Sequence, residues 1–163
     1  MKTDENRLDT LFESLKRERN EKAAERIASR ISDAWNHSGS ASVDLMMVWA
    51  KKAMDARKFD VALDFLDQVV TLRPEYAEGW NRRATAHYFM NNSRMAMADI
   101  NRTLQLEPRH FGALAGMARI LKDNGNKELA LNAWERVLAA YPMMRNAQNE
   151  VSTLSEELAG ERI

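Results

Sequence analysis

The prolines of this 163-residue chain are evenly spaced, because Pro74, Pro108 and Pro142 lie 34 residues apart. Two sets of alanines keep the same spacing: Ala50, Ala84 and Ala118, and Ala62, Ala96 and Ala130. A fixed period of this length is typical of helix–turn–helix units that stack into a solenoid. The spacing therefore predicts an all-α fold built from repeats.

The period divides the centre of the chain into units 43–76, 77–110 and 111–144. Positions 4, 7, 8 and 11 of the units form one mostly apolar helical stripe, and positions 20, 24 and 27 form a second, with Arg83, His87 and Thr103 as the polar members in the second unit. Alanine at positions 8 and 20 lets the two helices approach closely, and large residues at 4, 7, 24 and 27 are expected to fill the surrounding space. Proline at position 32 ends the second helix.

Two positions depart from this pattern. Position 7 of the second unit is Arg83, and an unpaired charge at a buried site is costly, so we expect a pair with Asp67 or Asp99. Position 15 closes the first helix and favours a left-handed residue. Asn91 and Gly125 suit that conformation, but its counterpart Arg57 predicts a small local strain or a different turn.

The residues at the signature positions, Trp80, Ala84, Ala96 and Pro108, give the chain a resemblance to the tetratricopeptide repeat (TPR) family over 43–144. The resemblance implies a right-handed α-solenoid that binds proteins on the concave side formed by its first helices. The segments 80–84 and 106–114 also resemble small α-proteobacterial members, many of which carry a cleaved export signal. By that resemblance Met1 would be an added start, and the location would be cytoplasmic as written or periplasmic if a signal was removed.

Both ends continue the helical pattern. Residues 5–38 match a degenerate capping repeat through Leu8, Leu11, Phe12, Leu15, Ala24 and Ile31. Four extra residues, 39–42, follow it, and Ser42 or Asp44 is predicted to cap the next helix. A capping helix is predicted at 145–159, with Gly160 ending it. We expect one domain, residues 1–163, with about nine helices and no sheet.

The resemblance places positions 2, 5, 6, 9, 12 and 13 of each unit on the concave side. We take as candidate peptide-binding residues Met47, Lys51, Met54, Asn81, Arg82, Thr85, Tyr88, Phe89, Arg119 and Lys122. Methionines and aromatics offer apolar contact area, and the basic side chains could hold a carboxylate. The alternative is an ordinary solvated face. The family's carboxylate clamp for chaperone tails is not reproduced, since Gly112 and Gly116 occupy its third-unit positions.

Composition excludes several other functions. Lys and Arg total 24, as do Asp and Glu, so no basic surplus favours nucleic acid. The chain lacks cysteine and apolar runs of membrane-spanning length. His37, His87 and His110 show no metal-binding spacing, and His87 is expected to pack in the core. We therefore expect no catalytic residue, metal or cofactor. The expected role is binding of a protein or peptide partner, with a structural or self-associating role as the alternative.

Overall fold

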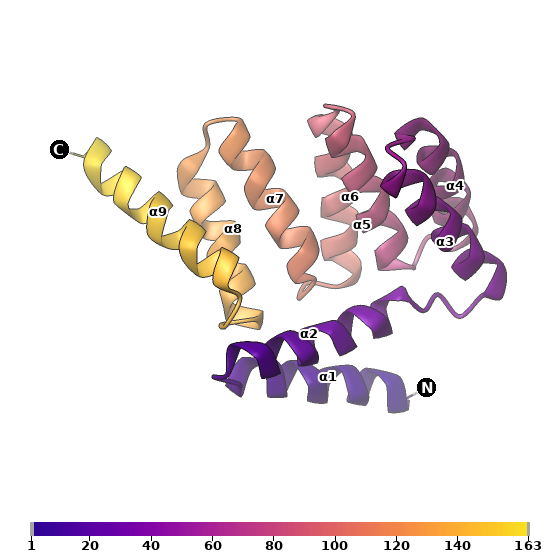
Figure 1. The fold of residues 1–163 in the computed structure, drawn as a ribbon, viewed down its shortest axis with the longest axis horizontal. Helices are drawn as coiled ribbons and strands as arrows, with labels where there is room; N and C mark the ends of the chain where they lie inside the picture. The colour runs from indigo at the N-terminus through magenta and orange to yellow at the C-terminus, as the bar shows by residue number, and fades with distance from the viewer. Residues whose placement is uncertain (1, 163) are drawn as a thin grey trace. The chain divides into compact units, whose positions relative to one another are not determined.

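The computed structural model describes residues 2–162, which form nine helices and no strand (Figure 1). The helices are α1 (Lys2–Arg17), α2 (Glu21–Asn36), α3 (Ala41–Asp55), α4 (Phe59–Leu72), α5 (Ala77–Phe89), α6 (Ser93–Leu106), α7 (Phe111–Asp123), α8 (Lys127–Ala140) and α9 (Arg145–Glu161). The predicted all-α fold, a right-handed solenoid of helix–turn–helix repeats, is confirmed. Each proline follows its helix by two residues, as its missing N–H group requires.

The helices form two compact units. The first contains the described parts of Met1–Ala34 and Leu114–Ile163, and the second contains Trp35–Ala113. The assignment of the whole chain to a single domain divided at 5–38, 43–76, 77–110, 111–144 and 145–159 stays a prediction.

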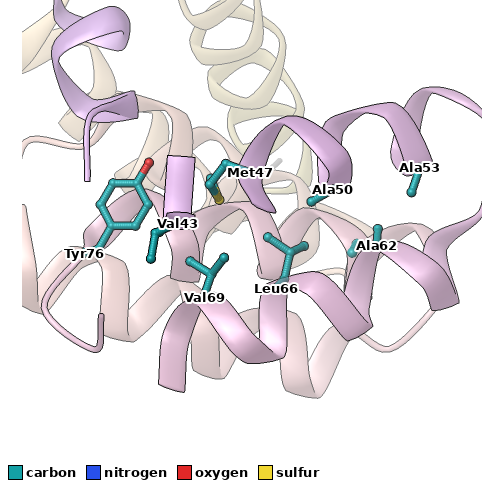
Figure 2. Close-up of a cluster of buried hydrophobic side chains, with 9 residues drawn as sticks. Val43, Met47, Ala50, Ala53, Ala62, Leu66, Val69 and Tyr76 are labelled. Carbon is teal, nitrogen blue, oxygen red and sulfur yellow. The ribbon is translucent and has the colours of Figure 1, made fainter. Parts of the chain in front are cut away.

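The core of the second unit begins between α3 and α4 (Figure 2). Ala50 of α3 and Ala62 of α4 are fully buried at the contact, and Leu66 and Val69 fill the space beside them. Further along the unit, α4 packs on α5, and α5 on α6. In this helix pair, the small residues at positions 8 and 20 therefore allow the close contact that the repeat pattern predicted.

The turns between paired helices share one left-handed residue. The φ angle is +59° at both Arg57 and Asn91 and +82° at Gly125. Arg57 therefore adopts the turn of its counterparts, and the alternative of a different turn is wrong. A side chain with a Cβ atom is disfavoured in this region, so Arg57 carries the local strain that its position predicted.

Two helix ends differ from the predictions. Ser40 caps α3, because its side chain accepts a hydrogen bond from the backbone N–H of Val43, so Ser42 and Asp44 are not the cap. Asp44 instead accepts bonds from the backbone and hydroxyl of Ser38, which holds the preceding turn. The last helix continues through Gly160 to Glu161, since glycine inside a helix weakens it without ending it.

In the first unit, α9 packs on α8. Leu154 is fully buried, whereas Val151 and Leu158 are half-buried. Carboxylates of α9 also pair with lysines of the two preceding helices. Lys122 Nζ of α7 lies 3.0 Å from Glu150, and Lys127 Nζ of α8 lies 3.5 Å from Glu157. The amphipathic helix α9, with acidic residues beside its apolar side, therefore covers the helix pair α7–α8.

A close approach between α4 and α5 gives a stability prediction. A Cβ atom on Gly79 would lie 2.8 Å from Cγ1 of Val69, whose side chain is fully buried. We expect Gly79→Ala to lower the free energy of unfolding by about 1–3 kcal/mol, although alanine is the better helix former. Urea denaturation measures this, with Gly160→Ala, where no atom lies within 4 Å, as the matched control. A stabilised Gly79→Ala variant would contradict the close approach.

One large residue at position 7 does not fill the core as predicted. Trp49 is 42% exposed, whereas the alanine beside it, Ala50, is fully buried. Its ring lies 5.5 Å from that of Phe65 on α4, so it covers this helix pair from outside. The repeat pattern does not distinguish the first full unit from the others, so it does not predict that Trp49 lies at the surface.

Candidate functional site

One face of α5 carries five of the candidate residues, because positions 81, 82, 85, 88 and 89 recur at helical spacing. Asn81, Arg82, Thr85 and Tyr88 are half-buried, and Phe89 is 51% exposed. Phe89 stacks on Phe59 at 5.3 Å and meets the edge of Tyr88 at 5.7 Å. This face, the α5 face, therefore offers accessible aromatic area next to an amide and a guanidinium group.

The candidates on α3 are less available to a partner. Met47 is 7% exposed and lies in the core cluster (Figure 2), and Met54 packs against that cluster. Lys51 is exposed, but its Nζ lies 2.9 Å from Asp55 Oδ2. Met47 presents almost no surface, so α3 offers mainly Lys51 and the half-buried Met54.

The two remaining candidates belong to the first unit. Lys122 pairs with Glu150, and the Arg119 guanidinium lies 5.8 Å from the centre of the Trp134 ring. Both side chains are exposed and keep donors free for another group. Their charge is partly compensated by this unit's own residues.

A buried polar cluster lies beside the α5 face. Glu78 Oε2 is 2.8 Å from Nε2 of His110, and these residues are 7% and 3% exposed. The backbone N–H of Ala113 donates to Nδ1 of His110, so Nε2 carries the proton and donates to Glu78. Asn81 Nδ2 lies 3.2 Å, and Arg82 Nη2 3.6 Å, from the other Glu78 oxygen.

His110 is also held by an aromatic ring from the end of α2. Trp35 stacks on it at 4.1 Å with an interplanar angle of 11°. The imidazole thus caps the start of α7, orients Glu78 and packs on Trp35. Glu78 is position 2 of its unit, one of the positions that the family resemblance puts on the concave side, but the sequence pattern does not link it to His110. The available signal was their position at the two ends of one unit, where α5 and α7 begin.

The Glu78 carboxyl is stabilised in its charged form. Burial alone would raise its pKa, but the hydrogen bond from His110 and the charge of Arg82 outweigh burial and lower the pKa below the ordinary 4.5. Its contribution to stability is therefore complete above pH 4.5 and is lost as the pH falls through the lower pKa of the folded chain.

The lowered pKa of Glu78 predicts that substituting this residue has a pH-dependent effect on stability. Above about pH 5, Glu78→Gln should lower the free energy of unfolding by about 1–3 kcal/mol, because it replaces a charged acceptor of the His110 bond. The difference from the parent chain should shrink in acid, where Glu78 is protonated too. Urea denaturation between about pH 3 and 7 measures it. A difference that stays constant across this range would contradict the lowered pKa.

Arg83 is paired, as its buried position predicted. Its Nε and Nη2 atoms lie 2.8 and 2.9 Å from the two oxygens of Asp99, and Nη1 lies 3.1 Å from Asp67. These bonds, first the one to Asp99, raise the pKa of Arg83. His87 is 6% exposed in the core, with Nε2 3.8 Å from Asp99. Arg83 is therefore engaged within the second unit.

The described residues offer neither a metal-binding cluster nor a membrane-spanning helix. Between residues 2 and 162, no His, Asp and Glu side chains gather in a group of three or more that could hold a metal ion. No helix in the same range has both the length and the apolar character needed to cross a membrane.

Comparison with curated proteins gives a relative over almost the whole chain. A TPR repeat-containing protein of Rhizobium etli is 54% identical over 156 residues, which are 96% of this chain and 76% of that protein. No protein-family model matches the chain.

Solved structures share the fold at low sequence identity. The first TPR of Spaghetti (RPAP3), bound to the HSP90 peptide SRMEEVD, is 23% identical with a TM-score of 0.68, over 72% of this chain and 93% of that one. The TPR2B domain of yeast Sti1, in complex with pHsp70, gives 17% and 0.67 over 72% and 99%. MamA gives 17% and 0.67 over 83% and 84%.

Proposed function

The chain belongs to the tetratricopeptide repeat family. We propose that it is a non-enzymatic module that binds a peptide or protein segment against the first helix of each helix–turn–helix unit. The observation that carries the proposal is the accessibility of the α5 face. Its aromatic side chains stay exposed or half-exposed while Ala84, Ala86 and His87 on the same helix are buried. Exposed aromatic area beside hydrogen-bonding groups is typical of a binding surface.

The chemistry of the face suggests the kind of segment that it takes. Phe89 and Tyr88 would pack on an apolar side chain, and the Asn81 amide can bind a peptide backbone. Arg82 lies 3.6 Å from Glu78 and so would offer its remaining donors to a carboxylate. Met54 and Lys51 on α3, and Arg119 and Lys122 on α7, are the other proposed contacts. Two solved relatives hold HSP90 and Hsp70 segments in the same fold.

An affinity capture from a bacterial lysate tests the proposal with matched variants. Phe89→Ala removes an exposed ring from the face, whereas Met90→Ala removes a neighbouring side chain of similar exposure, 45% against 51%, outside the candidate set. We expect Phe89→Ala to weaken the captured partner's binding by about tenfold or more, with unchanged helicity, and Met90→Ala to leave it unaffected. Equal retention by both variants would move the site away from α5.

The acidic part of the ligand is tested separately. Arg119→Glu combined with Lys122→Glu should abolish capture of a partner that places a carboxylate there. Lys127→Glu is the control, because it reverses a charge that also pairs with carboxylates of α9 but lies outside the candidate set. Loss with the control alone would show that α9, rather than the first helices, sets the binding.

A further inference from the structure

An apolar surface remains open on the helix pair α3–α4. Leu45, Val48, Trp49 and Val61 are 47%, 49%, 42% and 38% exposed, and Phe65 lies beside them against the Trp49 ring. These residues are the edge face, and three of them, Trp49, Val61 and Phe65, line an open hollow of about 480 Å³. Contiguous apolar surface of this kind on a soluble protein commonly marks an interaction site.

The repeat period indicates what shape of partner the edge face accepts. Trp49 and Arg83 occupy the same position in successive units, 34 residues apart. In the structure α4 packs on α5, and Asp67 of α4 reaches Arg83. A helix therefore lies against position 7 of α5, and a helix placed beside α3 in the same way would lie against Trp49.

The charges around the hollow indicate the chemistry of that helix. Lys52 and Lys58 line the hollow, both are exposed, and within residues 2–162 neither makes an ion pair. Elsewhere in the chain, a helix that packs beside another helix brings carboxylates to the basic side chains of that helix. Asp67 of α4 meets Arg83, and Glu150 and Glu157 of α9 meet Lys122 and Lys127.

We propose that the edge face is a second docking surface, which takes an amphipathic helix of a partner protein whose apolar side is flanked by carboxylates. Leucine-like side chains would enter the hollow between Trp49, Val61 and Phe65, and the carboxylates would pair with Lys52 and Lys58. This surface is separate from the α5 face and does not rest on the function proposed above.

The absence of cysteine from the chain allows a direct accessibility test. Val61→Cys places one thiol on the edge face of the full chain, and Asn101→Cys places one on the exposed side of α6 as control. The probe is a capped model peptide of about 18 residues with leucines at helical spacing and glutamates beside them. Saturating peptide should slow maleimide labelling of the Val61→Cys variant about tenfold and leave labelling of the Asn101→Cys control unchanged.

A charge exchange tests the recognition of carboxylates. A second peptide carries lysine in place of glutamate. The parent chain should bind the glutamate peptide about tenfold more tightly, because two exposed pairs replace two repulsions. Lys52→Glu with Lys58→Glu should reverse the preference, and the same reversals at Lys16 and Lys22, exposed on α1 and α2, should not.

Three outcomes would overturn the proposal. Binding of neither peptide at about 1 mM would remove the docking surface. A thiol at position 61 that is protected in the free monomer would show that the chain covers the face itself. Protection that appears only as the chain dimerises, measured by sedimentation, would assign the face to a second copy.

Discussion

We expect His110→Ala to lower the free energy of unfolding by about 3–5 kcal/mol, because it leaves the buried Glu78 charge without its main partner. The imidazole is 2.8 Å from the Glu78 carboxylate, it accepts the N–H of Ala113, and it stacks on Trp35. The substitution removes all three contacts and leaves a cavity beside the indole. Urea denaturation followed by circular dichroism measures the loss.

The control for this result is His37→Ala, because His37 is exposed at the end of α2, and a change within about 0.5 kcal/mol is expected there. In the His110→Ala background, Glu78→Gln should recover part of the lost stability, since a neutral amide is less costly to bury than an unpaired carboxylate. A His110→Ala variant that loses less than about 1 kcal/mol would contradict the structural role of the pair.

Charge reversal at the two carboxylates around Arg83 should give very unequal results. Asp99→Lys should cost about 3–5 kcal/mol, because it removes a bidentate pair and places a second cation at a buried site. The Asp99 side chain is 5% exposed. Asp67→Lys should cost less than about 1 kcal/mol, because the Asp67 side chain is 60% exposed and water screens its pair with Arg83.

The comparison is matched, since both variants make the same substitution next to one guanidinium group. Thermal and urea unfolding of the two variants measure the difference in their free energies of unfolding. Losses of equal size would show that burial does not decide the strength of these pairs. If Asp99→Lys left the stability unchanged, the result would contradict the explanation that pairing with Asp99 allows an arginine at position 7.

The fold was predictable because its main signals repeat. One proline and two alanines recur in each unit, so the same packing solution appears several times and can be read from the period. Arg83 was predictable too, because a charge at a buried position requires a nearby carboxylate, and Asp67 and Asp99 were the candidates. The side chains on the α5 face follow from helical spacing and from the family's pattern.

Other features depend on contacts that no local pattern records. The cap at Ser40 arises within a short insertion where several serines could serve. The Glu78–His110 pair joins the starts of two helices, and its stacking on Trp35 involves a segment outside the regular units. Trp49 shares its position with residues that face a neighbouring helix, so its exposure depends on what lies beside α3, which the period does not state.

Site-specific photo-crosslinking in a bacterial lysate tests the binding role of the α5 face most directly. A benzophenone amino acid is placed at Phe89, which is exposed on this face, and at Asn101, which is exposed on α6. We predict that a discrete partner crosslinks through position 89 and is absent with position 101, and that Phe89→Ala weakens its capture. Crosslinking through position 101 with none through position 89 would contradict binding at the α5 face.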